Sequence, residues 1–332
     1  MKKLAMVFVT VLVLTTVFFA ACSKKGSDES FVLKIGYSGS LCEAPLHIAY
    51  EKGYFAEEGL TVELTRLAPG TAFDALTAGQ IDASFALLAS IVQPLANGLP
   101  AKITTGLHTG CDIVLVKADS GITRAEDLRG KRIGVPSMTS SPVIYAKRVL
   151  ADNGVDIRMA SSQVEFIVYS TSDLPLVLSN GGVDAIAMNE PTATIAANEY
   201  GYVTLFDSAV DEPYRDHYCC VAYVSDRLAS GNIAAAQKYT RAMQRASAYI
   251  QGHQEEITAI QIEKNYVAGN AAVNAEVLKK FNYIPSVSGA YEAFGITAPQ
   301  LQVIGMLSED VNTEALQRNS FVFLEGLDGQ FR

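Results

Sequence analysis

The chain has 332 residues and a formal net charge of −9. This acidic balance argues against a nucleic-acid partner, which requires a basic face. The length is enough for one large domain or two ordinary ones, and 49% of the residues are hydrophobic, so the cores can be filled. We expect two lobes.

The N-terminal segment has the features of an export signal. A positive start, MKK, precedes the apolar run LAMVFVTVLVLTTVFFA, and two alanines then lead to Cys22. This order resembles a bacterial lipobox, in which the cysteine is acylated. A retained membrane helix is the alternative, but the run is near the lower length limit for a span, and the polar stretch that follows suits a lipid anchor. We predict a lipoprotein signal peptide at 1–21, a lipid on Cys22 and a flexible tether at 22–30. The protein would be exported and held at the outer face of the cytoplasmic membrane or in the periplasm.

Two segments of the remaining chain alternate strand and helix patterns. Short β-rich runs are expected at 31–38, 60–67, 81–87, 127–137, 164–170 and 183–191. Helix patterns lie between them at 45–55, 71–80, 140–154 and 173–182. This βαβαβ order predicts parallel sheets with helices on their faces. After residue 226 the chain becomes mostly helical, with helices expected at 234–253 and 274–281.

Several phrases carry a specific resemblance that extends over most of residues 31–270. They are APLHIAYEKGYFAEEGLTVEL, ALTAGQIDASFA, DLRGKRIGVPSMTSSP, GGVDAIAMNEPTATIA and YVSDRLA. In order and spacing they resemble the nitrate, sulfonate, taurine and thiamine-precursor family of ABC-transporter substrate-binding proteins. The resemblance implies an α/β, two-lobed type II periplasmic-binding-protein fold with a helical C-terminal tail.

The resemblance also implies which parts of the chain form each lobe. One lobe would hold 31–112 together with 222–332, and the other would hold 113–221. Extended crossings near GCDIVLV and YCCVAYV would form a hinge that closes on a small solute. We expect a monomer without a cofactor, and an ABC permease with its ATPase as partners.

Residues at the ends of strands are the best candidates for ligand contact, because unpaired N–H groups at helix starts attract anions. The strongest candidate is the loop SMTSSP, whose family counterpart binds ligand; its other interpretation is an ordinary serine N-cap. Glu190 could bind an amine or ring N–H, or could be a charge at a helix start. The predicted ligand-binding residues are Ser38, Gly39, Ser40, Cys42, Leu88, Ser90, His108, Ser137, Thr139, Ser140, Ser141, Asn189, Glu190, Tyr218, Cys219 and Cys220. Rings that could stack on a ligand are Tyr37, Phe85, Tyr145, Tyr169 and Tyr218.

Four thiols remain once Cys22 is assigned to lipid, and their spacing matches no disulfide framework. They could be buried and reduced, could form a disulfide, or could line a cleft that binds a soft ligand or a metal with His108 or His217. We predict mainly reduced thiols and no resident metal. Neighbours on a strand face opposite ways, so Cys42 and only one of Cys219 and Cys220 would border the cleft.

No enzyme motif is present among GxxxxGK[ST], GxGxxG, GxSxG and HExxH. A thiamine-pyrimidine synthase of the same fold is the enzyme alternative, but the stretch FALLAS at 85–90 lacks the lysine and histidine that this enzyme carries there. A third possibility is a lipoprotein that senses its ligand without transport. We therefore predict a receptor, not an enzyme, for an organosulfonate-like anion or, second, a thiamine-pyrimidine precursor.

Overall fold

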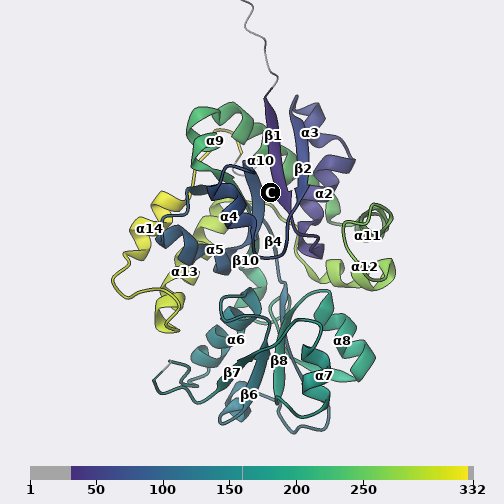
Figure 1. The fold of residues 1–332 in the computed structure, drawn as a ribbon, viewed down its shortest axis with the longest axis vertical. Coiled ribbons are helices and arrows are strands. Elements are labelled where there is room, and N and C mark those ends of the chain that lie inside the picture. Colours follow the sequence, from purple (N-terminus) through teal and green to yellow (C-terminus); the bar gives the residue numbers. More distant parts are fainter. Residues whose placement is uncertain (1–30, 159, 328–332) are drawn as a thin grey trace, which may run out of the picture. The chain divides into compact units, whose positions relative to one another are not determined.

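Two five-stranded sheets form the framework of the protein (Figure 1). The computed structural model describes residues 31–158 and 160–327, so the signal peptide, Cys22 and tether predicted at 1–30 lie outside the described residues. The chain divides into Met1–Val32 and Leu33–Arg332, and the fold below is that of the second unit. Among the described residues, every helix is too short or too polar to span a bilayer.

The first sheet, sheet A, has the strand order β2-β1-β3-β10-β4. Its strands are β1 (Val32–Tyr37), β2 (Thr61–Arg66), β3 (Ala83–Leu87), β4 (Ala101–Thr109) and β10 (Tyr218–Ser225). β1 and β3 pair in parallel, as the βαβ order predicted, whereas β10 is antiparallel to both β3 and β4. Sheet A is therefore mixed, and its fourth strand returns from a distant part of the sequence.

The second sheet, sheet B, has the order β7-β6-β8-β5-β9. Its strands are β5 (Asp112–Lys117), β6 (Arg132–Val135), β7 (Glu165–Val168), β8 (Ala185–Asn189) and β9 (Tyr202–Asp207). β6 is parallel to β7 and β8, and β5 is antiparallel to β8 and β9. All six strand patterns expected from the sequence are present. β5 and β10 contain the segments expected as extended crossings, and they pair as antiparallel strands, whereas β4 and β9 were not predicted.

Helices connect the strands within each sheet. In the first segment they are η1 (Leu41–Glu43, a 3₁₀ helix), α2 (Ala44–Glu51), α3 (Tyr54–Glu57), α4 (Ala72–Thr77) and α5 (Leu88–Ala96). Beside sheet B lie η2 (Ala125–Leu128), α6 (Ser141–Asp152), α7 (Leu174–Ser179), α8 (Thr192–Tyr200) and η3 (Tyr214–Asp216). The single helix expected at 45–55 is wrong in one respect: it is broken into α2 and α3, because Gly53 takes a left-handed conformation with φ 75°.

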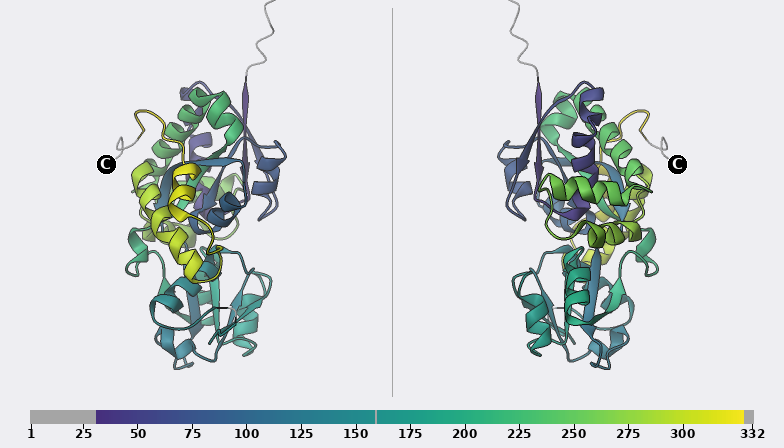
Figure 2. Two further views of the ribbon diagram at one scale, coloured as in Figure 1. Left: turned by 90° about the vertical axis from the view of Figure 1, so that its left-hand side faces the viewer. Right: turned by 90° about the vertical axis from the view of Figure 1, so that its right-hand side faces the viewer.

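The C-terminal part is helical, as predicted. It comprises α9 (Asp226–Gly231), α10 (Ile233–Ile250), α11 (Gln254–Glu263), α12 (Ala271–Lys280), α13 (Val287–Val303) and α14 (Thr313–Ser320). The green and yellow helices of this part lie beside the strands of sheet A (Figure 2), where α10 contacts α2 and β4, and α13 contacts β4 and α5. α10 buries residues at helical spacing, such as Tyr239, Met243 and Ala246, and its N-cap Asn232 accepts from the Ala235 N–H.

The chain passes between the sheets at two crossings. The first crossing, Gly110–Cys111, joins β4 to β5, and the second, 208–217, joins β9 to β10. The hydroxyl of Ser208 accepts from the N–H groups of Cys111 (2.9 Å) and Asp112 (2.8 Å). Gly110 has φ +71°, and a Cβ there would lie 2.5 Å from Cβ of Ala209. The two crossings therefore run in contact with each other.

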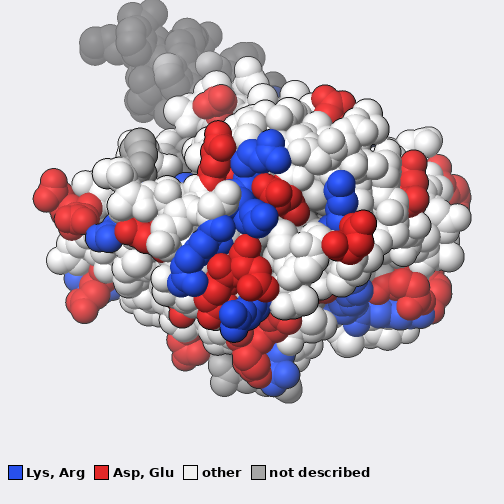
Figure 3. All heavy atoms as spheres, turned by 90° about the horizontal axis from the view of Figure 1, so that it is seen from below, with Lys and Arg blue, Asp and Glu red and all other residues white. Residues whose placement is uncertain are grey.

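Charges on the surface are mixed in sign. On the face shown in Figure 3, basic and acidic side chains lie next to one another. The ion pairs Arg132–Asp184 (3.4 Å) and Arg158–Asp156 (2.9 Å) are of this kind, with partly or largely exposed side chains. Such pairs contribute little stability each, on the order of 0–1 kcal/mol.

Candidate functional site

A cavity of about 700 Å³ opens where the ends of several strands meet. Its walls come from the loops after β1, β2 and β3 of sheet A and from those after β6, β7 and β8 of sheet B. This volume lies within the range of small-molecule pockets, about 300–1,000 Å³. The cavity is therefore the candidate functional site.

Many of the predicted ligand-binding residues line this cavity. These are Ser38, Ser40, Cys42, Ser90, Ser137, Thr139, Ser140, Ser141 and Asn189. A smaller neighbouring pocket is lined by Ser141 together with Tyr218 and Cys219. Gly39, Leu88, His108, Glu190 and Cys220 line neither. The structure thus brings together the serine-rich loop and the ends of β1 and β3.

Glu43 occupies the loop that follows β1, and the sequence interpretation missed it. Its carboxylate accepts from the backbone N–H groups of Ser38 (2.7 Å), Gly39 (2.7 Å) and Ser40 (2.8 Å). The left-handed Gly39, with φ 90°, belongs to this turn. Burial raises the pKa of Glu43. The three N–H groups expected to meet a ligand are therefore already bonded within the chain.

The start of α6 adjoins the same cavity. Ser140 is its N-cap and makes no capping bond with its side chain; the Ser140 hydroxyl instead donates to the Ser137 carbonyl (2.9 Å). Ser141 donates to the carboxylate of Asp112 (2.6 Å), which also accepts from the Asn189 amide (2.6 Å). Asp112 begins β5 and is buried, and burial raises its pKa. Asp112, which the sequence interpretation also missed, thus connects the serine-rich loop to the end of β8.

More of the cavity wall is apolar than polar, and the wall has no positively charged side chain among the described residues. Among the described residues that line it, none is lysine, arginine or histidine, and Glu43 is the only Asp or Glu. Aromatic rings come from Tyr37, Phe73 and Phe85. Tyr37 and Phe85 were among the expected stacking residues; Phe73, on α4, was not. The wall therefore suits a small solute with an apolar or planar body.

Glu190 has partners of its own away from the cavity. It is 3% exposed and accepts from the N–H (2.9 Å) and the hydroxyl (2.7 Å) of Thr194, four residues later. The ammonium of Lys280, on α12, lies 3.4 Å away. Burial nevertheless raises the pKa of Glu190. These contacts fit the helix-start interpretation of Glu190.

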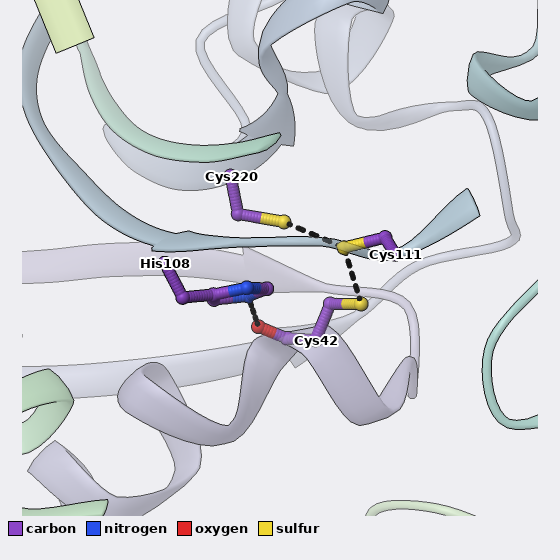
Figure 4. A group of neighbouring side chains, drawn as sticks. All are labelled: Cys42, His108, Cys111 and Cys220. Atoms are coloured by element: carbon purple, nitrogen blue, oxygen red, sulfur yellow. Dashed lines mark hydrogen bonds between the residues drawn. The ribbon is translucent and has the colours of Figure 1, made fainter. Parts of the chain in front are cut away.

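Three of the cysteines form a cluster with a histidine, and Cys219 adjoins this cluster at Cys111. Cys42, Cys111 and Cys220 lie together with His108 (Figure 4), and none of the four cysteines in the described residues forms a disulfide. Cys219 lines the small pocket, whereas Cys220 is fully buried. The vicinal pair thus points two ways, as strand alternation requires. His217 also lines the small pocket and is not in the cluster.

The fold and the cavity together define a class of protein, the type II periplasmic-binding-protein fold with a ligand cavity between two sheets. A solved structure of this class, the periplasmic aliphatic sulphonate binding protein SsuA from Escherichia coli, is similar with a TM-score of 0.73. It is 18% identical, and the match covers 91% of this chain and 96% of that one.

The sequence model of the NMT1-like family matches residues 26–262, and the chain belongs to this family. Two curated relatives are similar over much of their length. The 4-amino-5-hydroxymethyl-2-methylpyrimidine phosphate synthase of Aspergillus parasiticus is 26% identical over 235 residues, which cover 68% of this chain and 67% of the relative. The putative aliphatic sulfonates-binding protein of Bacillus subtilis is 27% identical over 232 residues, which cover 67% of each. The family resemblance expected from the sequence is confirmed.

Proposed function

We propose that the chain is an exported receptor that delivers a small polar organic solute to an ABC importer. The observation that carries this proposal is the cavity of about 700 Å³ whose walls come from both sheets. A solute held there would contact both halves of the chain and favour whichever arrangement of the sheets fits it best. We assign 31–112 with 222–332 to one lobe and 113–221 to the other, with the crossings as the hinge.

The chemistry of the wall supports a neutral solute with a planar or apolar body over a simple anion. Among the described residues no lysine, arginine or histidine lines the cavity, and the backbone N–H groups after β1 already donate to Glu43. An organosulfonate would depend on the start of α6 and on hydroxyls such as that of Thr139. Phe73 and Phe85 offer apolar faces to a ring. This reverses the order expected from the serine-rich loop, and we place a thiamine-type pyrimidine ahead of an organosulfonate.

A binding role is favoured over catalysis by the end of β3. Phe85, Leu87, Ala89 and Ser90 line the cavity there, and none can act as an amine or an imidazole in a reaction. We propose that the protein reaches the cell exterior through the signal at 1–21 and is held by a lipid on Cys22. A sensing role without transport would use the same cavity; a permease and ATPase encoded beside the chain favour transport.

Mass spectrometry of solute released from freshly purified protein, followed by calorimetry, tests the function. We expect one solute per chain and measurable binding of an aminopyrimidine. Phe73→Ala should weaken that binding about tenfold or more, while the matched change Phe323→Ala, at a 61% exposed ring outside the cavity, should not.

The two ligand classes predict opposite results for the serine-rich loop. If an aliphatic sulfonate binds instead, and the double change Thr139→Ala and Ser140→Ala abolishes its binding, the anion assignment replaces the pyrimidine one. Hydrogen bonds to charged groups contribute about 1.5–3 kcal/mol each, so the loss would be large. If no solute is released and neither class binds, the receptor function is refuted.

A further inference from the structure

Four potential metal ligands from three separate stretches of the sequence meet in the protein interior (Figure 4). Cys42 belongs to η1, His108 to β4, Cys111 to the first crossing and Cys220 to β10. All four side chains are buried, and one donor atom from each lies within 4.8 Å of the other three. Cys219, next in sequence to Cys220, is not part of this group. We call Cys42, His108, Cys111 and Cys220 the Cys₃His cluster.

The spacing of the sulfur atoms fits coordination to one ion. The Sγ of Cys111 is 3.2 Å from that of Cys42 and 3.5 Å from that of Cys220. Thiolates around a tetrahedral zinc, with Zn–S of about 2.3 Å, lie about 3.7 Å apart. These two separations are therefore within a few tenths of an ångström of those around a tetrahedral ion, and the Sγ atoms of Cys42 and Cys220 lie within 4.8 Å of each other.

His108 is held as a metal-binding histidine would be. Its ring stacks on Phe281, with centroids 5.1 Å apart and planes 5° from parallel, and also contacts Tyr283. Nδ1 lies 3.1 Å from the Thr109 carbonyl, and Nε2 lies 3.3 Å from the Cys42 carbonyl. A neutral imidazole has a single N–H and can donate to only one of them. If Nδ1 donates to Thr109, Nε2 keeps its lone pair, and a backbone carbonyl is a usual second partner of a metal-bound imidazole. In the present arrangement Nε2 faces the Cys42 carbonyl, so binding of an ion requires the ring to turn from this oxygen toward the thiols.

We infer that the Cys₃His cluster binds one thiophilic d-block cation, with zinc(II) as the best match. Thiolates and imidazole are preferred by zinc, and four protein ligands leave no open position, which is typical of a structural rather than a catalytic ion. Binding would convert three thiols to thiolates and release three protons to solvent, so the occupied site carries one negative charge.

The position of the site gives the ion a mechanical role. Cys111 lies in the first crossing, and Cys220 belongs to the strand that the second crossing enters, while Cys42 lines the solute cavity. An ion shared by these segments would fix the first crossing and the end of β4 to η1 and to the start of β10. It would therefore stiffen the passage between the sheets next to the cavity, whichever solute binds there.

Metal analysis and cobalt spectroscopy of anaerobically purified protein test the inference. We expect close to one equivalent of a thiophilic metal as isolated. After removal of this metal by a chelator, one equivalent of Co²⁺ should give intense visible d–d bands and a near-ultraviolet thiolate-to-cobalt band, and Zn²⁺ should displace it. A weak octahedral spectrum would overturn the site.

The vicinal cysteines offer a matched pair of variants. Cys220→Ser should weaken Co²⁺ binding by more than about 100-fold and remove the rise in melting temperature on adding Zn²⁺, whereas Cys219→Ser should retain both. If Cys220→Ser does not fold, Cys111→Ser is measured in the same way, and the metal-free wild type gives the melting reference. Equal loss in Cys219→Ser and Cys220→Ser, or a disulfide between Cys42 and Cys111 in the anaerobic protein, would refute the assignment.

Discussion

His47 is predicted to make the protein acid-sensitive. The ring is fully buried on α2, its Nδ1 accepts from the Gln261 amide (3.0 Å), and it stacks on Tyr266 with centroids 4.2 Å apart. Burial, aided by the positive charge of Arg66, lowers the pKa of His47 to about 3 from 6.5. In the unfolded chain His47 therefore binds a proton near pH 6.5, whereas in the folded chain it stays neutral until the pH approaches about 3. The free energy of unfolding decreases as the pH falls through this window.

The magnitude follows from this pKa difference. Each pH unit inside that window costs about 1.4 kcal/mol, so a fall from about pH 7 to about pH 4.5 should remove roughly 2.7 kcal/mol through His47 alone. His47→Gln cannot titrate but keeps an oxygen that can accept from Gln261. The free energy of unfolding of the wild type relative to His47→Gln should therefore fall by that amount between the two pH values.

Urea unfolding followed by circular dichroism at both pH values measures this difference, since all other titrating groups are shared by the two proteins. His253→Gln, at an exposed histidine, is the matched control and should leave the pH dependence of the wild type in place. A wild-type to His47→Gln difference that is the same at both pH values, within about 0.5 kcal/mol, would refute the argument that burial keeps His47 neutral.

Three further outcomes are expected. Gly289→Ala should lower the free energy of unfolding by about 1–3 kcal/mol in urea titrations, because a Cβ there would overlap the ring of Tyr218; an unchanged midpoint would contradict this packing. Leu33→Ala, at a fully buried position, should cost about 2–5 kcal/mol, whereas Leu176→Ala, at a 53% exposed one, should cost under about 1 kcal/mol; equal losses would place the core elsewhere. The raised pKa of Glu190 means that the folded chain holds a proton that the unfolded chain has released, so the free energy of unfolding declines as the pH rises from about 4.3 through the folded pKa. Glu190→Gln should remove this decline. If the free energy of unfolding of Glu190→Gln instead has the same pH dependence as that of the wild type, Lys280 keeps the carboxylate charged.

The strands and helices expected in the two βαβ segments were readable from the sequence because each has its own periodicity and is bounded by glycine or polar residues. The sequence interpretation did not include β4, β9, α5, α8, α13 and α14. The break at Gly53 was harder to predict, since the apolar pattern continues across it. Glu43 could have been found: Ser40 and Glu43 are spaced as a capping box, and the structure has both of its bonds. That spacing predicts a carboxylate turned back on the loop.

The sequence offered metal binding by the thiols with His108 or His217 as one of three alternatives, but it did not show which cysteines and which histidine meet in the Cys₃His cluster. Cys42 and Cys111 are 69 residues apart, and Cys111 and Cys220 are 109 apart. The pairing of β10 with β4 brings Cys220 to Cys111, and the pairings of β1 with β3 and of β3 with β10 bring the segment of Cys42 to them. No local pattern records such a contact. The same holds for Asp112 and Asn189, which meet because β5 and β8 are antiparallel neighbours. Side chains joined by sheet pairing become visible only once the strand order is known.

Ser208 joins the two crossings. Its hydroxyl accepts from the N–H of Cys111 in the first crossing and from that of Asp112 at the start of β5, and the Ser208 N–H donates to the Asp112 carbonyl (3.0 Å). Two crossings without hydrogen bonds between them would allow one sheet both to twist and to slide relative to the other. Two crossings joined by hydrogen bonds resist twisting and sliding, because sliding would break all three bonds at once. Bending of the joined crossings breaks none of these bonds. If the crossings act as the proposed hinge, these bonds would favour bending of the pair of crossings over sliding of one crossing along the other.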